Sequence, residues 1–240
     1  MYYRDDLALV HHLGFGFHAD MCAPGILALL QPVRRRGGVV LELGCGSGLL
    51  TRHLVEAGHQ VIATDASPAM LELAREYAPG AGEVRQVVLP DDPLPPVDAV
   101  VSVGHVLCYL ADEAAFTRAV AAAARALRPA GVIAFDVCDL EWNRARAGAP
   151  PGVRRGDGWL IVTEFDQPSE SRFVRDMTTF IRNPDGTWRR DEEHHENFLL
   201  DTSLLPGELA THGVDVAVRP SFGDEELPPG LVAVVGSRPE

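Results

Sequence analysis

The sequence LELGCGSG at residues 41–48 joins a short apolar run to a segment with helical periodicity. The run 39–43 is typical of a buried strand, and 49–57 is typical of a helix that Gly58 ends. Glycines in such a turn let the backbone approach a ligand closely, at the edge of a parallel sheet where α/β folds bind ligands. We therefore expect a ligand site on this turn.

Strands and helices alternate on both sides of this turn. Further short apolar runs predict strands at 60–64, 84–89, 98–103 and 132–137. Helices are expected between them, at 67–77 with Ser67 as N-cap and Pro68 in the first turn, and at 112–127 with Asp112 as N-cap. Continuous apolar strands alternating with helices predict a doubly wound, Rossmann-like α/β sheet covered on both faces.

The pattern changes after residue 139. Residues 140–157 are rich in Arg, Pro and Gly and are expected to form a loop or short helix. The stretches 159–165, 172–182 and 187–200 predict an antiparallel meander, and a helix at 203–212 and strands at 214–219 and 231–236 complete the chain. We expect four parts, namely an N-terminal helical cap (1–36), a core (37–140), an antiparallel lid insert (141–201) and a C-terminal return to the core (202–240).

Composition excludes several classes of partner and mechanism. The 240 residues carry a formal net charge of −13, and all 21 basic residues are arginine. An acidic chain lacks the cations that grip nucleic-acid phosphates or an anionic membrane surface, so neither partner is expected. The absence of lysine excludes Schiff-base chemistry and the lysine of a phosphate-binding P-loop.

The cysteines and the N-terminal residues indicate the cellular compartment in which the protein is expected. The four cysteines lie far apart and form no C-x-x-C pair, so we expect neither a disulfide framework nor a metal site. The first residues lack the basic and apolar regions of a signal peptide. A soluble, cytoplasmic protein, either a monomer or a homodimer, is the expectation.

Three motifs in order carry a family resemblance. The turn reads G-x-G-x-G, two residues after the acid Glu42, whereas a dinucleotide fingerprint would require glycine at Leu49. Asp65 ends the next strand, and residues 98–110 read DAVVSVGHVLCYL. This combination resembles the class I S-adenosylmethionine (SAM)-dependent methyltransferases and implies their seven-stranded sheet and SAM as cofactor.

The resemblance also implies which residues hold that cofactor. The glycine-rich turn would face the methionine end, Asp65 would take the ribose, and Gly104 would lie beside the methionine carboxylate or the methyl group. Many relatives place a polar residue at the third strand, where this chain has Val87-Val88-Leu89, so the backbone at Val88 to Pro90 is expected to contact the adenine instead. The predicted cofactor-binding residues are Glu42, Gly44, Cys45, Gly46, Gly48, Asp65, Ala66, Met70, Leu89, Pro90, Gly104 and His105.

Missing motifs narrow the acceptor to a small molecule. Residues 104–107 read Gly-His-Val-Leu instead of the D-P-P-Y type of sequence found in enzymes that methylate nucleobases or amides, and no Pro-Cys nucleophile is present. The insert is similar to the β-lid of glycine and amino-sugar N-methyltransferases, which implies a pocket closed by lid and N-terminus. Transfer to a nitrogen or oxygen atom, in natural-product tailoring, is therefore expected.

Four residues are candidates for catalysis. His105 follows a motif strand, and His195 lies in the expected lid strand, where His194 must face the opposite side. A neutral imidazole suits a general base near pH 7. Asp139 and Tyr3 are the other two candidates, and Asp139 is equally compatible with the role of a loop cap. Outside these four, Arg144 is a possible contact for an anionic acceptor, although a charged residue in such a loop is usually just solvated.

Two alternatives remain open from the sequence. A SAM-fold enzyme that no longer methylates, such as a cyclase or pericyclase, would keep Glu42, Gly48 and Asp65. A noncatalytic SAM-binding module would keep them as well. Formation of S-adenosylhomocysteine on turnover distinguishes both from a methyltransferase.

Overall fold

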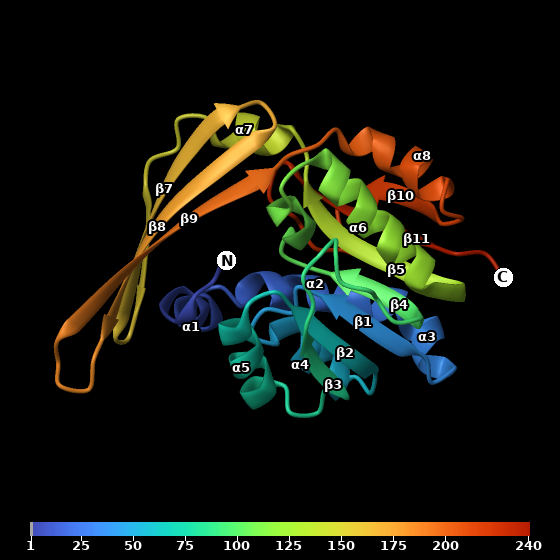
Figure 1. Cartoon of the computed structure of the whole chain (residues 1–240), viewed down its shortest axis with the longest axis horizontal. Coiled ribbons are helices and arrows are strands. Elements are labelled where there is room, and N and C mark those ends of the chain that lie inside the picture. Colours follow the sequence, from blue (N-terminus) through green and yellow to red (C-terminus); the bar gives the residue numbers. More distant parts are fainter. Residues whose placement is uncertain (1) are drawn as a thin grey trace.

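A computed structural model describes residues 2–240 as two sheets and the helices around them (Figure 1). The larger sheet contains, in spatial order, β10 (Asp215–Arg219), β11 (Leu231–Ser237), β5 (Leu127–Cys138), β4 (Val97–Ser102), β1 (Val39–Leu43), β2 (Gln60–Asp65) and β3 (Glu83–Gln86). The five strands from β5 to β3 pair in parallel, whereas β11 is antiparallel to both of its neighbours. This is the expected doubly wound, seven-stranded Rossmann-like sheet.

Helices cover the larger sheet and precede it. The helices are α1 (Asp5–Gly14), α2 (Phe17–Leu29), α3 (Gln31–Arg35), α4 (Leu49–Glu56), α5 (Pro68–Tyr77), α6 (Glu113–Ala126), α7 (Glu141–Arg146) and α8 (Leu205–Ala210), with 3₁₀ turns at Val106–Tyr109 and Thr202–Leu204. The two predicted N-caps are confirmed, because Ser67 accepts the Met70 amide at 3.2 Å and Asp112 accepts the Ala115 amide at 2.8 Å. These caps fix where α5 and α6 begin.

The second sheet is the lid, which extends away from the larger sheet (Figure 1). It contains β6 (Gly152–Gly156), β7 (Trp159–Ser169), β8 (Arg172–Arg182) and β9 (Trp188–Phe198), all antiparallel. The strand β6 lies within the segment 140–157, which was expected to be a loop or short helix. It is an edge strand with charged, exposed residues, and such strands lack the apolar alternation that reveals a buried one.

The helix α1 packs on the lid and on α5, between the two sheets. Leu7 and Val10 of this helix form a small apolar cluster with Trp159, Met177 and other lid residues. That cluster is separate from the main core of the larger sheet. The N-terminal segment and the lid therefore form one side of the space that opens at the carboxyl ends of β1, β2 and β4.

Three further strand boundaries differ from the sequence prediction by three residues or more. The strand β7 runs to Ser169 rather than ending at residue 165. The strand β3 ends at Gln86 rather than at Leu89, because the backbone leaves the sheet at Val88, whose amide donates to the Asp92 carboxylate. The strand β5 begins at Leu127 rather than at Val132. Among residues 2–240, none of the helices is long and apolar enough to cross a membrane.

Candidate active site

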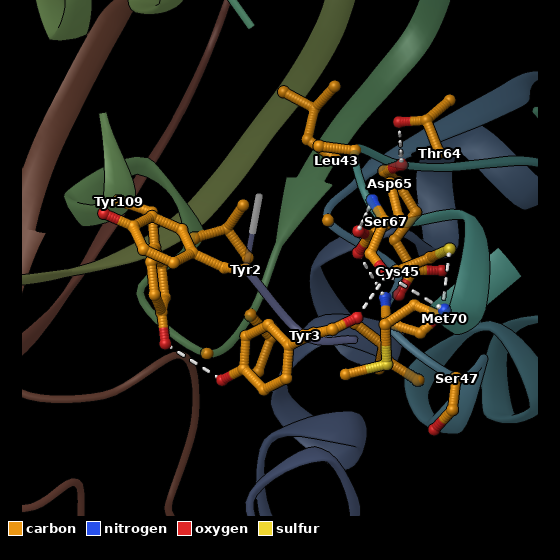
Figure 2. Close-up of a pocket in the computed structure, with 18 of the residues that line it drawn as sticks. Tyr2, Tyr3, Leu43, Cys45, Ser47, Thr64, Asp65, Ser67, Met70 and Tyr109 are labelled. Atoms are coloured by element: carbon orange, nitrogen blue, oxygen red, sulfur yellow. Dashed lines mark hydrogen bonds between the residues drawn. The ribbon is translucent and has the colours of Figure 1, made fainter. Parts of the chain in front are cut away.

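A cavity of about 370 Å³ lies where the strands β1, β2 and β4 end, and Tyr2 and Tyr3 of the N-terminal segment also line it (Figure 2). This volume is within the range of about 300–1,000 Å³ that small-molecule sites occupy. The cavity has two chemically different ends. Figure 2 shows Asp65, Ser67 and Met70 at one end and Tyr109 at the other, with Tyr3 between them.

The end at the glycine-rich turn is shaped by backbone. Gly44, Gly46 and Gly48 all have positive φ values, and a Cβ on Gly44 would lie 2.3 Å from a methyl carbon of Val106. Glycine is therefore required at residue 44 for the chain to pass this close to the neighbouring turn. A Cβ on Gly104 would meet nothing within 4 Å, so open space lies beside this part of the cavity wall.

Asp65 organises the same end. Its carboxylate accepts the Gly46 amide at 2.9 Å and the Ser67 amide at 2.8 Å, which ties the end of β2 to the glycine-rich turn and to the start of α5. Burial raises the pKa of Asp65, although these backbone hydrogen bonds oppose the shift. A carboxylate at this position can accept hydrogen bonds from the hydroxyls of a ribose.

The opposite end carries a chain of hydrogen-bonding side chains. The Tyr109 hydroxyl lies 2.9 Å from the Tyr3 hydroxyl and 3.4 Å from His195 Nδ1, and it also accepts an N–H from Arg175. His195 Nε2 lies 2.9 Å from a carboxylate oxygen of Glu193. Of these residues, Tyr3 and Tyr109 line the cavity, whereas His195 lies behind Tyr109 with no exposed surface.

Glu193 connects this chain to the N-terminal segment. Its two carboxylate oxygens accept the backbone amides of Tyr3 and Arg4, each at 2.7 Å. The Tyr3 carbonyl in turn accepts the Ser67 hydroxyl at 2.7 Å. The N-terminal segment therefore bridges the lid and the start of α5 across the cavity.

Asp136 on β5 supports the cavity wall from inside the sheet. Its fully buried carboxylate accepts the backbone amides of Gly104 at 2.9 Å and His105 at 2.6 Å. The same carboxylate lies 2.8 Å from Nε2 of His18, a residue of α2 that lines the cavity. Asp136 therefore holds the turn after β4 and orients an imidazole at the cavity wall.

The cavity brings together most of the residues that the sequence singled out for the cofactor. The lining includes Glu42, Gly44, Cys45, Gly46, Asp65, Ala66, Met70, Leu89 and Gly104. Gly48, Pro90 and His105 lie outside the lining. Gly48 instead precedes α4 and faces Ala74 of α5 and Ala78, which directly follows that helix.

The catalytic candidates are separated by the fold. Tyr3 lines the cavity, whereas His105, His195, Asp139 and Arg144 do not. Asp139 accepts the backbone amide and the hydroxyl of Thr202, at 3.1 and 2.5 Å, and Arg144 pairs with Glu170 at 3.0 Å. These contacts give Asp139 and Arg144 structural partners away from the cavity.

Sequence reasoning missed His18, Tyr109, Asp136, Arg175 and Glu193. A signal was present for one of them, because Asp136 is a carboxyl group within the apolar run 132–137. A buried carboxylate must find hydrogen-bond donors, and these are often at a site. Tyr109 also lies within the fourth motif, but nothing in the sequence indicates that it meets the lid.

Burial changes the pKa of three groups around the cavity. The pKa of His11 falls to about 4 and that of His105 to about 3, because burial disfavours the charged ring and the positive charge of Arg175 adds to the effect. Burial raises the pKa of Glu42 to about 8, although Thr51 donates its hydroxyl to the carboxylate at 2.7 Å. All three groups are therefore mainly neutral at pH 7 in the unliganded chain.

We expect the free energy of unfolding of the unliganded chain to be highest near pH 6.5. Below pH 6.5 the unfolded chain binds protons on His11, His105 and other histidines whose pKa burial lowers, such as His195, whereas the folded chain holds an extra proton on Glu42. The unfolded state thus binds more protons, so stability falls on acidification. Above pH 6.5 the raised pKa values of Glu42 and His194 make the folded state bind more protons, and stability falls as the pH rises.

Urea unfolding at pH 5, 6.5 and 8 measures this profile. The variant Glu42→Gln keeps the acidic decline and is expected to show a smaller alkaline one, because His194 still titrates there. An alkaline decline of the same size in Glu42→Gln would show that another group causes it.

Comparisons with known proteins agree with this architecture. The profile of the methyltransferase domain family matches residues 40–131. An uncharacterized methyltransferase of Mycobacterium tuberculosis is 37% identical over 181 residues, and the match covers 74% of this chain and 64% of that relative. A ubiquinone biosynthesis O-methyltransferase of a Methylobacterium species is 30% identical over 195 residues, covering 71% of this chain and 74% of the relative.

A solved structure shows the same fold over the whole chain. The sugar N-methyltransferase KedS8 from a Streptoalloteichus species has a TM-score of 0.77 with 23% identity, covering 100% of this chain and 96% of that one. The ordered motifs, the seven-stranded sheet and these matches together identify the chain as a member of the class I SAM-dependent methyltransferases, whose cofactor is S-adenosyl-L-methionine.

Proposed function

We propose that this chain transfers the methyl group of SAM to a nitrogen or oxygen atom of a small metabolite, in the tailoring of a natural product. The observation that supports this most strongly is one cavity whose two ends differ. One end has the glycine-rich turn and Asp65, and the other has Tyr3 and Tyr109 beneath the lid. The similarity to KedS8, a sugar N-methyltransferase, agrees with a small acceptor of this kind.

The residues of the first end suit the cofactor. We infer that Asp65 accepts the ribose hydroxyls, that Ala66, Met70 and the backbone at 87–89 contact the adenine, and that Gly44 to Gly46 and Gly104 contact the methionine part. The open space beside Gly104 supports this assignment. When bound, SAM supplies an electrophilic methyl group on a sulfonium.

The other end suits an acceptor that loses a proton. Burial lowers the pKa of His195, so its ring is neutral at pH 7, and the contact with the Glu193 carboxylate assigns the proton to Nε2. Nδ1 is then free to accept the Tyr109 proton, while the Tyr109 oxygen takes the proton of the acceptor. Burial raises the pKa of Tyr109 well above 10, so the phenol stays protonated between turnovers.

In this relay Tyr109 is the catalytic residue and His195 is a positioning residue. Glu193 stabilises the imidazolium that the transfer creates, in the way that a buried carboxylate supports a histidine base. Tyr2, Tyr3 and Phe15 cover the cavity and exclude water from the reacting atoms. Orientation within this closed space supplies a large part of the rate enhancement.

Four further assignments concern the parts of the chain, its location, its oligomeric state and its partners. We propose the division into a cap (1–36), a core (37–140), a lid (141–201) and a C-terminal part (202–240), a cytoplasmic location, and a monomer or homodimer without nucleic-acid or membrane partners. The acidic net charge of −13 supports the last point.

The proposal is tested by incubating the protein with SAM and a panel of small amines, amino acids and hydroxylated compounds. Formation of S-adenosylhomocysteine with a methylated product is the expected result. Binding of SAM without any methylated product would favour a cyclase or a noncatalytic module instead.

The variant Asp65→Ala is expected to weaken SAM binding at least tenfold, which corresponds to about 1.4 kcal/mol. The loss follows from the hydrogen bonds to the ribose and from release of the Gly46 amide. Isothermal titration calorimetry measures the affinity, and Asp224→Ala, at an exposed loop, is the matched control. Equal affinity in Asp65→Ala and wild type would remove Asp65 from the cofactor site.

A further inference from the structure

The guanidinium of Arg175 lies behind Tyr109, a residue of the cavity lining, and has no counter-charge among residues 2–240. Its Nη2 donates to the Tyr109 hydroxyl and, at 3.0 Å, to Asn197 Oδ1, and both of these acceptors are neutral. No carboxylate among residues 2–240 lies within 4.0 Å of this guanidinium, although the chain has 34 acidic residues. An arginine that is half-buried, with its Nε fully removed from water and no partner ion, is costly, so this arrangement points to a ligand.

The remaining N–H groups of Arg175 are free to bind such a ligand. Its Nε is buried and has no acceptor in the described part of the chain, and Nη1 donates no hydrogen bond there. A guanidinium presents its N–H groups in a fixed planar fork that matches the oxygens of a carboxylate or phosphate. The free side of Arg175 therefore has the chemistry of an oxyanion site.

Other unsatisfied polar atoms belong to the same group of side chains. Asn197 Nδ2, Trp142 Nε1 and His105 Nδ1 are buried and have no hydrogen-bond partner within residues 2–240. Buried polar groups without partners are rare in folded proteins, and an unbound ligand is one explanation for several together.

These side chains form a closed ring of contacts. The rings of His105 and Tyr109 stack with their centroids 5.9 Å apart, and the centroid of the His105 ring lies 5.5 Å from that of Trp142. The ring centroids of Trp142 and Phe173 lie 5.9 Å apart. Phe173 and Arg175 share one face of β8, and Asn197 is directly opposite Phe173 on β9. The ring closes through the bonds of Arg175 to Asn197 and Tyr109. It thus begins and ends at Tyr109, which lines the lid end of the cavity.

We propose that Arg175 binds an oxyanion of the acceptor, a carboxylate or a phosphate group, next to Tyr109. The inference rests on the proposed function, because it assigns one chemical group to the metabolite that this site methylates. The acceptor then carries its nucleophilic atom and its anion on neighbouring parts of one small molecule. In the low-dielectric space below the lid, this ion pair is stronger than the same pair in water.

Binding of simple anions tests the proposal without knowledge of the acceptor. The protein is saturated with S-adenosylhomocysteine and titrated with sodium acetate or inorganic phosphate at constant ionic strength, and tryptophan and tyrosine fluorescence report binding. The wild type is expected to bind at least one of the two anions, and Arg175→Met is expected to weaken that binding at least tenfold. Arg172→Met is the matched control, because Arg172 lies on the same strand and faces the other side.

The arms of this experiment separate the two sources of the anion. Binding of acetate alone identifies a carboxylate acceptor, and binding of phosphate alone identifies a phosphorylated one. If both anions bind, the acceptor panel decides between them. Turnover of a free acid but not of its methyl ester identifies a carboxylate acceptor. Turnover of a phosphorylated compound but not of its parent alcohol identifies a phosphate acceptor. Absence of binding by the wild type, or equal binding by Arg175→Met, overturns the proposal.

The readouts also separate this proposal from the proposed function. Retention of S-adenosylhomocysteine binding in a protein that binds no anion would leave the methyltransferase assignment intact. If Arg175→Met disturbs the lid and loses S-adenosylhomocysteine as well, Asn197→Leu replaces it as the test. That variant removes one donor from the same ring, keeps the charge of Arg175 and is expected to weaken anion binding about threefold.

Discussion

Replacing His195 with glutamine is expected to lower turnover about 100-fold while leaving SAM affinity within about twofold of the wild type. Removal of a positioned proton acceptor typically costs a factor of about 10² to 10⁴. Glutamine keeps a polar side chain between Tyr109 and Glu193 but cannot take up a proton. The effect is measured as the rate of S-adenosylhomocysteine formation with the acceptor that the panel identifies.

The pH dependence distinguishes proton transfer from a purely structural role. The pKa of His195 is lowered by burial, so the ring stays neutral at pH values below its ordinary 6.5. The kcat of the wild type should therefore fall only on acidification below pH 6.5, as the imidazole becomes protonated and ceases to accept. His195→Gln should lose this acidic limb.

A neighbouring residue provides the matched control for this prediction. His194 lies on the opposite face of β9 and pairs with Asp176 at 2.7 Å on the exposed side of the lid. His194→Gln is expected to turn over at the wild-type rate. Wild-type turnover in His195→Gln would instead mean that orientation alone activates the acceptor.

The second large effect is expected from Asp136→Ala, which should lower the free energy of unfolding by about 3 kcal/mol or more. The substitution leaves two backbone amides and the Nε2 of His18 without their buried acceptor, and each unsatisfied donor costs about 1–3 kcal/mol. It also frees the turn at Gly104 and His105, so SAM affinity should fall as well. Urea unfolding and calorimetry measure the two changes.

Two control variants, Asp136→Asn and Asp201→Ala, distinguish the loss of buried hydrogen bonds from the loss of any acidic side chain. Asp136→Asn keeps one carbonyl oxygen and is expected to recover part of the stability. Asp201→Ala removes an exposed acceptor of the Ser203 amide and should change stability by less than about 1 kcal/mol. A loss in Asp136→Ala no larger than in Asp201→Ala would show that water satisfies the freed amides.

The larger sheet and the clustering of Asp65 with the glycine-rich turn could be predicted from the sequence because both depend on local signals. Apolar runs, glycines and caps lie within a few residues of each other, and parallel strands bring their carboxyl ends to one edge. Asp65 and the glycine-rich turn could therefore be placed together before any contact was known. The edge strand β6 was not predicted because its residues, which include Arg154 and Arg155, do not alternate between apolar and polar side chains.

The end of the cavity at Tyr109 depends on contacts between distant segments, which periodicity does not encode. Alternation along β9 predicts that His195 and Asn197 share a face, but not that this face meets Tyr109. The contact of Glu193 with the amides of Tyr3 and Arg4 joins residues 190 and 189 positions apart. Only the assembled fold shows that the histidine lies one side chain behind the cavity.

The separate apolar cluster between α1 and the lid has a consequence for the order in which parts of the molecule unfold. Because Leu7 and Val10 of α1 pack with Trp159 and Met177 of the lid and not with the main core, α1 and this part of the lid can open together while the seven-stranded sheet remains folded. Phe173 of β8 belongs to the main core, so the amide hydrogens of α1 and of β8 from Met177 onward should exchange at a common rate, faster than those of β1 and β4. Under the proposed function, such a sub-global opening would give a bulky acceptor a route into the site that leaves the glycine-rich turn undisturbed.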